Sequence, residues 1–165
     1  MNQKQHILKI IKVILFMSMT QATSAASKDL SYKYKLEEIF ERPLIVGASV
    51  SADYGTESPG KKVALRYTAA EKIKTIATGG QAGRDTLKLV DSSTLKDRSV
   101  VIGVDLFFWD STKPSPQESV KALHKLMSEV KEKNIPVILG EIPTLLPQYQ
   151  PSLAKLNQEL SEACK

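Results

Sequence analysis

The chain is poor in cysteine and histidine. Among its 165 residues there is one cysteine, Cys164, and there are only two histidines, His6 and His124. A single cysteine excludes an intramolecular disulfide and leaves a free thiol, an intermolecular bond, or a partner cysteine missing from the chain. Any chemistry that needs an imidazole base therefore depends on two positions.

Long hydrophobic runs are also lacking. The uninterrupted apolar stretch near the start covers residues 13–19, far short of the roughly 20 residues that a membrane span needs. A basic start, this stretch, and the small residues 22–26 follow the order typical of a secretory signal peptide. We predict a leader over residues 1–25, cleaved after Ala25, and export to the periplasm or the medium. An amphipathic N-terminal helix is the alternative. No cysteine directly follows the apolar stretch, so the sequence does not indicate a lipid anchor.

The positive charge lies largely in this leader. The net charge is +5, and Lys4, Lys9 and Lys12 contribute three of these charges, which leaves +2 for the remainder. A value so near neutral gives no electrostatic reason to expect nucleic-acid binding. A hydrophobic content of 42% with 25% charged residues is that of a globular protein, so we expect a folded domain.

Short apolar segments alternate with segments of helical periodicity after residue 42. Strands are expected at 43–48, 72–77, 99–104 and 136–140, and helices near 64–70 and over 83–95, 115–133 and 151–164. The helix over 83–95 should turn Leu87, Leu89 and Val90 inward, and Ser115 or Ser119 should cap the helix over 115–133. Buried strands separated by helices predict a three-layer α/β/α domain with a parallel, flavodoxin-like sheet over residues 43–165, preceded by an arm over 26–42. Such folds place their chemistry at the carboxyl ends of the strands.

Ser49 follows the first predicted strand in the run Val46-Gly-Ala-Ser-Val-Ser-Ala52. A serine that comes directly after a strand, among small residues, presents both its hydroxyl and its amide at the edge of the sheet. This geometry suits a nucleophile whose own N–H binds the oxyanion, although a phosphate-binding turn or a plain connection has the same composition.

This run resembles the first block of the SGNH/GDSL hydrolases, Gly-Asp-Ser-Leu/Val-Ser, with Ala48 in place of the aspartate. The resemblance implies a serine ester hydrolase with Ser49 as nucleophile. The run 78–84, Thr-Gly-Gly-Gln-Ala-Gly-Arg, resembles the second block, which implies that the amide of Gly83 is an oxyanion donor. A flexible turn is the alternative for that segment.

The third block of the family has an asparagine where this chain has Asp105. A carboxylate beside an oxyanion repels it unless protonated, so Asp105 is assigned to the site either as an organiser of the loop or as a holder of a neighbouring residue. The aromatic residues 107–109 either line a substrate pocket or pack beneath the loop.

The fourth block, Asp-x-x-His, is absent. His6 lies in the leader and His124 lies within a predicted helix, where we expect a surface position rather than a base.

The resemblance covers roughly residues 40–163, and it implies that a C-terminal segment of the family fold is missing. We therefore expect an exported serine ester hydrolase scaffold for a small-molecule, glycan or lipid ester, inactive without its base, or alternatively a non-catalytic periplasmic binding or accessory protein. A metal or phosphate site on Asp53, Asp105 and Asp110 is disfavoured because no ligand spacing appears, so no cofactor is expected.

Overall fold

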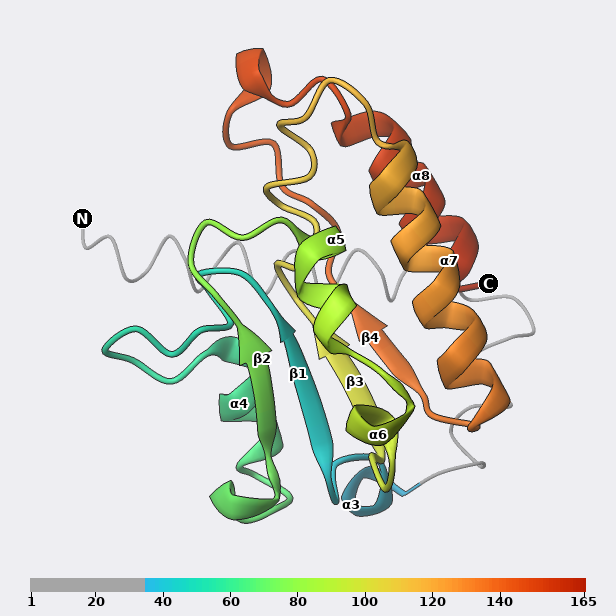
Figure 1. The fold of residues 1–165 in the computed structure, drawn as a ribbon. Helices are drawn as coiled ribbons and strands as arrows, with labels where there is room; N and C mark the ends of the chain where they lie inside the picture. The colour runs from blue at the N-terminus through green and yellow to red at the C-terminus, as the bar shows by residue number, and fades with distance from the viewer. Residues whose placement is uncertain (1–34) are drawn as a thin grey trace, which may run out of the picture. The chain divides into compact units, whose positions relative to one another are not determined.

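The computed structural model describes residues 35–165, of which Leu36–Lys165 form one compact unit (Figure 1). The predicted leader, its cleavage site and His6 lie outside the described residues, so export stays a prediction. Four strands form a single parallel sheet in the order β2-β1-β3-β4. They are β1 (Pro43–Gly47), β2 (Lys74–Ala77), β3 (Val100–Gly103) and β4 (Val137–Leu139). The predicted α/β class with a flavodoxin-like parallel sheet is confirmed.

The chain reverses its direction of travel across the sheet after β2. From β1 it crosses to β2 on one side and then returns to β3 on the other side of β1. The carboxyl ends of β1 and its two neighbours therefore flank the topological switch point. Open α/β sheets bind their ligands in the crevice at this point.

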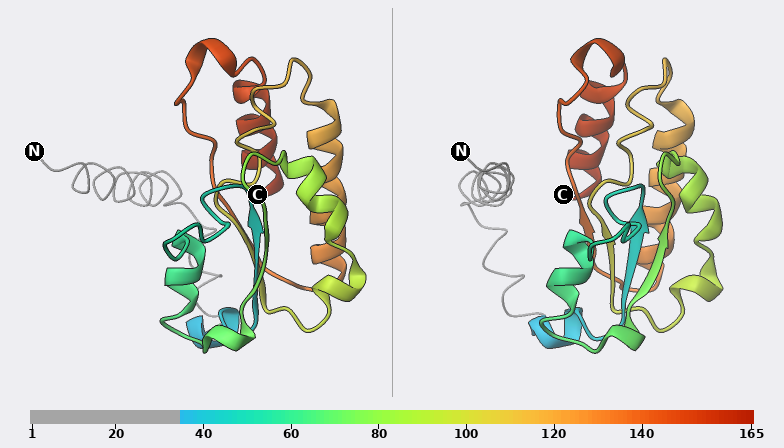
Figure 2. Two further views of the ribbon diagram at one scale, coloured as in Figure 1. Left: turned by 60° about the vertical axis from the view of Figure 1, so that its left-hand side comes forward. Right: turned by 90° about the vertical axis from the view of Figure 1, so that its left-hand side faces the viewer.

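Helices cover both faces of the sheet (Figure 2). One face carries α5 (Gly83–Thr86), α6 (Ser92–Leu95), α7 (Gln117–Glu132) and α8 (Leu153–Ala163), and the other carries α3 (Leu36–Ile39) and α4 (Pro59–Ala64). Successive residues of a strand point to opposite faces. Leu44 and Val46 of β1 accordingly pack in the larger core with α7 and α8, whereas Ile45 packs in the smaller core with Ala64 of α4.

The helix expected near residues 64–70 lies earlier in the chain. Ser58 caps α4 by accepting the Lys61 amide at 3.3 Å, and Pro59 occupies the first helical position. Proline at this position is preorganised for a helix and gives up only an amide that has no helical partner. The prediction was wrong because it missed this Ser-Pro start; α4 ends at Ala64 and a 3-10 helix, η1 (Ala70–Lys72), follows.

The single helix expected over residues 83–95 is also wrong, because the segment divides into α5, the 3-10 helix η2 (Leu87–Leu89) and α6. Asp91 starts α6 by accepting the Thr94 amide at 2.7 Å, and such a side-chain cap begins a new helix rather than continuing an old one. The break turns Leu89 outward with 58% of its surface exposed, whereas Leu87 and Val90 are buried as predicted.

The two long helices agree with the sequence pattern. Leu123, Leu126 and Val130 form the buried side of α7. Pro116 occupies the N-cap of α7 without a side-chain hydrogen bond, so neither predicted serine caps it, and Ser119 instead donates to Asp110.

The segment before β1 packs into the domain. Phe40 is buried and stacks on Tyr67 at a centroid distance of 5.2 Å, which joins residues that the sequence analysis assigned to an arm to the smaller core. Over residues 35–165, no helix is both long and apolar enough to cross a membrane.

Candidate active site

Ser49 lies in the turn directly after β1, at the carboxyl edge of the sheet. The strand itself is buried at all five positions, and the chain becomes exposed at Ser49 and Val50. Among the described residues, the Ser49 hydroxyl and amide have no hydrogen-bond partner, although the amides on both sides of it do. The serine thus stands exposed on a backbone that is fixed on either side.

Asp105, which follows β3, fixes this backbone. Its Oδ1 accepts the Ala48 amide at 3.1 Å and the Ser51 hydroxyl at 2.6 Å, and its Oδ2 accepts the Val50 amide at 2.8 Å. Hydrogen bonds to a carboxylate are about twice as strong as those between neutral groups. Both oxygens are engaged, so Asp105 organises the loop that carries Ser49, which is one of the two roles considered from the sequence. We call these three hydrogen bonds the Asp105 clamp.

Gly47 leaves room for the Asp105 carboxylate and the Ser51 hydroxyl. A β-carbon added at this position would lie 2.2 Å from Oδ1 of Asp105 and 2.4 Å from Oγ of Ser51. Neither distance is possible for real atoms, so the carboxylate approaches the loop only because residue 47 has no side chain. The glycine two residues before Ser49 is therefore explained by close approach and not by backbone conformation.

Gly83 begins α5 and is held in a second carboxylate network. Its amide donates to Oδ2 of Asp110, a fully buried carboxylate that also accepts the Arg84 amide at 3.3 Å and the Ser119 hydroxyl at 2.6 Å. An amide has one hydrogen, and the hydrogen bond to Asp110 uses it. The donor that the resemblance assigns to the oxyanion hole is therefore directed at a protein carboxylate in this structure.

Tyr54 connects the loop after β1 to the loop after β2. Its phenolic oxygen accepts the Gly79 amide at 3.0 Å, and its ring lies so close to Gly79 that an added β-carbon would meet Cε2 at 2.7 Å. Two thirds of the Tyr54 surface is nevertheless exposed. The Tyr54 side chain is therefore held in place at the carboxyl edge of the sheet, which we call the rim, while most of the ring is exposed to solvent.

The residue before Tyr54 anchors the same loop from its other end. Asp53 has a left-handed backbone (φ 54°) and accepts the Ser58 amide at 2.6 Å and Nζ of Lys61 at 2.7 Å. The hydrogen bond from Lys61 lowers the pKa of Asp53 below its usual 3.8, and the reciprocal hydrogen bond raises the pKa of Lys61. The loop 48–58 is thus tied down at Asp105, at Gly79 and at Lys61.

The aromatic residues 107–109 pack against the rest of the domain. Phe107 is buried in the larger core, which favours the packing role for it, and Phe108 and Trp109 meet edge to face with their ring centroids 5.2 Å apart.

His124 lies on α7 with 61% of its side chain exposed, and its Nε2 is 3.2 Å from Oε2 of Glu159 of α8. It is therefore a surface helix residue, as expected. Within residues 35–165 no group of three histidine, cysteine or acidic side chains is placed to hold a metal.

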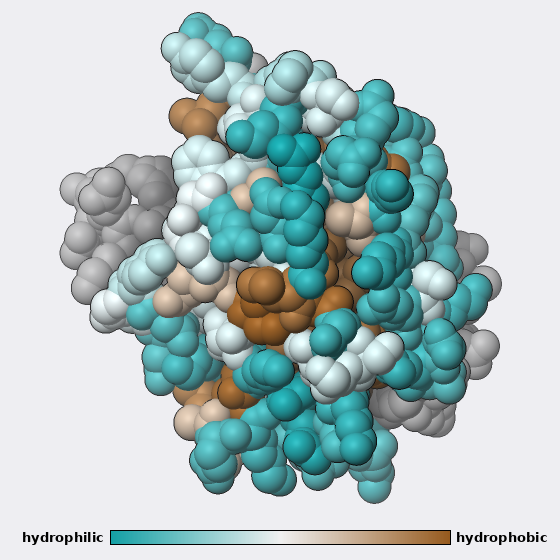
Figure 3. All heavy atoms as spheres, viewed as in Figure 1, coloured by the Kyte–Doolittle hydropathy of each residue, from teal (hydrophilic) through white to brown (hydrophobic). Residues whose placement is uncertain are grey.

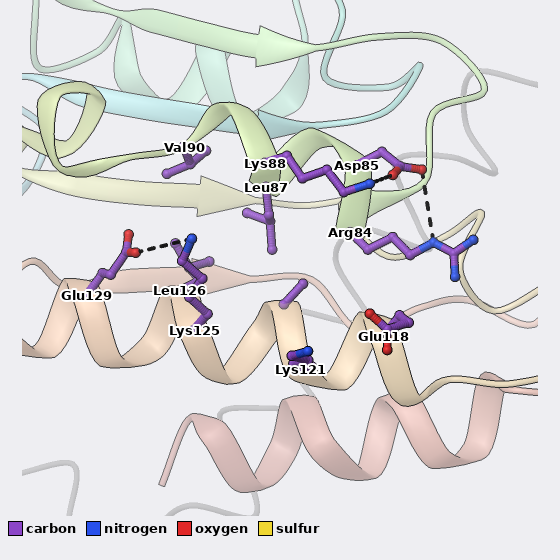
Figure 4. Close-up of a pocket in the computed structure, with 11 residues that line it drawn as sticks. Arg84, Asp85, Leu87, Lys88, Val90, Glu118, Lys121, Lys125, Leu126 and Glu129 are labelled. Atoms are coloured by element: carbon purple, nitrogen blue, oxygen red, sulfur yellow. Dashed lines mark hydrogen bonds and ion pairs between the residues drawn. The ribbon is translucent and has the colours of Figure 1, made fainter.

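A groove of about 530 Å³ lies between α5–η2 and α7, away from Ser49 (Figure 4). Its floor is apolar, with Leu87, Val90 and Leu126, and charged side chains that include Lys88 and Glu129 stand along its rim. Figure 3 shows apolar surface in the middle of this face of the molecule. Charged residues of the groove form ion pairs, Lys88 with Asp85 and Lys125 with Glu129, and its lining includes no serine, cysteine or histidine.

Sequence reasoning gave no role to Ser51 or Tyr54, and it considered Asp110 only for a disfavoured metal or phosphate site. Ser51 belongs to the quoted motif but received no role, and Tyr54 gave no signal beyond its place in the loop. Asp110 is the one for which a signal existed, because an aspartate within an apolar segment needs buried donors.

No protein-family model matches this chain, and no curated protein is similar enough to count as a match. The arrangement of the residues therefore carries the functional argument. An exposed serine at a switch point, on a loop fixed by a carboxylate, is suited to nucleophilic attack or to hydrogen bonding with a ligand.

Proposed function

We propose that this chain is an exported serine ester hydrolase of the SGNH/GDSL type, with Ser49 as nucleophile. One observation carries the proposal: the amides of Ala48 and Val50 are both fixed by Asp105, while the hydroxyl and amide of the exposed Ser49 between them lack partners among the described residues. Because the backbone on both sides of Ser49 is fixed, the serine is already oriented toward a substrate, and the loop need not reorganise during the reaction.

In the proposed reaction Oγ of Ser49 attacks the carbonyl carbon of an ester. A bond forms between Oγ and that carbon, the bond to the alcohol oxygen breaks, and the seryl proton ends on the departing alcohol. The Ser49 amide is the donor placed to stabilise the charge on the carbonyl oxygen. Water then cleaves the acyl-serine and returns the serine to its hydroxyl form.

The residues described around Ser49 include no base for the proton transfer. Loss of one member of a catalytic triad lowers turnover about 10⁴-fold or more. We therefore expect slow turnover from the residues that the structure describes, because a hydrolase at full rate requires a base that they do not supply.

A non-catalytic binding protein on the same scaffold is the second candidate, and the hydrogen bond from Gly83 to Asp110 favours it. With that amide occupied, the amide of Ser49 itself is the one oxyanion donor proposed among residues 35–165. Removal of one such donor costs about 10²- to 10³-fold in turnover. A protein that binds a ligand without reacting with it needs no second oxyanion donor, so it would tolerate this arrangement.

Labelling with a fluorophosphonate probe separates the two candidates. The hydrolase predicts covalent label on Ser49 that is located by mass spectrometry, absent from Ser49→Ala, and unchanged in Ser161→Ala, which alters an exposed serine of α8. Release of p-nitrophenol from p-nitrophenyl acetate should follow the same pattern. If Ser49 takes up no more label than Ser161 after long incubation, the hydrolase proposal fails and the binding protein stands.

A further inference from the structure

The exposed aromatic ring of Tyr54 is not used by the chemistry proposed for Ser49. Aromatic side chains on a surface usually move freely between rotamers, whereas Tyr54 is held at its tip by the Gly79 amide and at its base by the anchored Asp53. Two thirds of its surface still faces solvent. A ring that is both fixed and exposed stands ready to bind a ligand, because binding costs it little conformational entropy.

Tyr54 and Ser49 lie on the same stretch of the rim. Gly47 of β1 pairs with Ala77 of β2, and Ser49 and Gly79 each lie two residues beyond this pair. The hydroxyl of Tyr54, 3.0 Å from the Gly79 amide, therefore lies at the same carboxyl edge of the sheet as Ser49, beyond the neighbouring strand.

The surroundings of the ring are open and mostly polar. Thr78 and Gly80, which flank the Gly79 that Tyr54 contacts, are exposed, and so are Ser49 and Val50 of the same loop as Tyr54. A long acyl chain gains affinity by leaving water for an enclosed apolar pocket, which this open rim does not provide. A sugar ring, in contrast, places its weakly positive C–H groups on the negative face of an aromatic ring while its hydroxyls remain in water.

We propose that Tyr54 is the platform of a carbohydrate subsite, so that the ester acted on at Ser49 is carried by a sugar. The acyl group lies at Ser49, and the sugar ring stacks on Tyr54 in the direction of the loop after β2. Because the Tyr54 oxygen accepts the Gly79 amide, its own O–H hydrogen remains available as a donor to a sugar hydroxyl. The proposal rests on the proposed function of Ser49 for the position of the ester, but sugar binding is measurable without any reaction.

The test is a titration of the ¹⁵N-labelled protein with xylotriose, cellotriose and chitotriose, each free and O-acetylated, followed by the amide shifts of Val50 and Gly79. We expect saturable shifts with at least one sugar. Tyr54→Ala should weaken this binding roughly tenfold, whereas Tyr54→Phe, which keeps the ring, should stay within about threefold. Tyr149→Ala is the matched control, because Tyr149 of η3 (Pro147–Tyr149) is equally exposed at 67% and should leave binding unchanged.

Each other outcome has a definite meaning. No shift with any sugar, or equal binding by wild type and Tyr54→Ala, overturns the subsite. Shifts of the same amides with short-chain phosphatidylcholine vesicles in place of sugars overturn it as well and assign the rim to acyl chains. Sugar binding that is lost in Tyr54→Ala but kept in Ser49→Ala, in a protein whose Ser49 takes no fluorophosphonate, retains the subsite and rejects only the hydrolase.

Discussion

Oδ2 of Asp105 accepts the amide of Val50 at 2.8 Å, which fixes the backbone on the far side of the candidate nucleophile. The other oxygen, Oδ1, holds the Ala48 amide and the Ser51 hydroxyl. The two oxygens therefore accept hydrogen bonds from different groups, and a substitution at residue 105 that replaces one oxygen affects these hydrogen bonds unequally.

Asp105→Asn should release the Val50 amide while leaving much of the Ala48 interaction in place. An asparagine offers one acceptor oxygen, and if this oxygen takes the place of Oδ1 with its two donors, an NH₂ group faces the Val50 N–H. Losing a hydrogen bond to a charged group should cost about 1.5–3 kcal/mol of unfolding free energy. Amide hydrogen exchange measured by NMR should show faster exchange at Val50 than at Ala48. Equal acceleration at both positions would contradict the division of tasks.

Gly47→Ala should disrupt the Asp105 clamp by steric overlap. The added carbon would meet Oδ1 of Asp105 at 2.2 Å, so either the carboxylate or β1 must move, at a cost of about 3 kcal/mol. Gly80→Ala is the control, because Gly80 has a left-handed backbone (φ 74°) with open space around it and should lose only about 1–2 kcal/mol. Urea unfolding gives both values. A smaller loss in Gly47→Ala than in Gly80→Ala would rule out the close approach as the reason for glycine at residue 47.

Asp110→Ala should destabilise the domain strongly. It leaves the amides of Gly83 and Arg84 and the hydroxyl of Ser119 without their buried acceptor, and each unpaired buried donor costs about 1–3 kcal/mol. We expect a total loss of at least about 3 kcal/mol in chemical denaturation. Ser119→Ala removes one donor and keeps the acceptor, so it should lose only about 1–2 kcal/mol. Similar losses in the two variants would show that the amides find other partners.

The ion pair between Asp53 and Lys61 should make part of the stability depend on pH. The folded pKa of Asp53 is lowered, so its contribution is full above the ordinary value of 3.8 and disappears as the pH falls through the folded value. The folded pKa of Lys61 is raised, so its contribution is full below 10.5 and disappears as the pH rises beyond it. Unfolding free energies of wild type and Lys61→Met should therefore converge below pH 3.8. Curves that stay parallel down to pH 2 would argue against the pair.

The central strands β1 and β3 were predictable because burial on both faces requires continuous apolar residues, whereas the edge strands β2 and β4 are partly exposed, β4 against the expectation of a buried strand. All five positions of β1 and all four of β3 are buried, and these were the plainest apolar runs of the sequence. The segment after β2 was harder, because the apolar Leu87, Leu89 and Val90 fit one helix as well as a broken one. The signal that distinguishes them is local: Asp91 three residues before Thr94 marks a new helix start.

The site was predictable only as far as single positions. The place of Ser49 followed from the end of β1, since the end of a strand determines which residues reach the edge of a sheet. The Asp105 clamp and the bond from Gly83 to Asp110 join residues that only the folded sheet brings together, and no periodicity or spacing in the sequence indicates which amide a carboxylate accepts. The resemblance gave Gly83 an oxyanion role, and the folded chain gives its amide to Asp110.

The bonds of the Asp105 clamp span 54 to 57 residues of sequence. Contacts of such length form late in folding, because the chain must close a long loop before they compensate the entropy lost. The clamp also requires β1 and β3 to be paired in their final register. Ser49 therefore acquires its geometry only in the last stages of folding, and a partly folded chain exposes an ordinary serine. Reactivity at this one hydroxyl should consequently appear, during refolding, no earlier than the completed sheet.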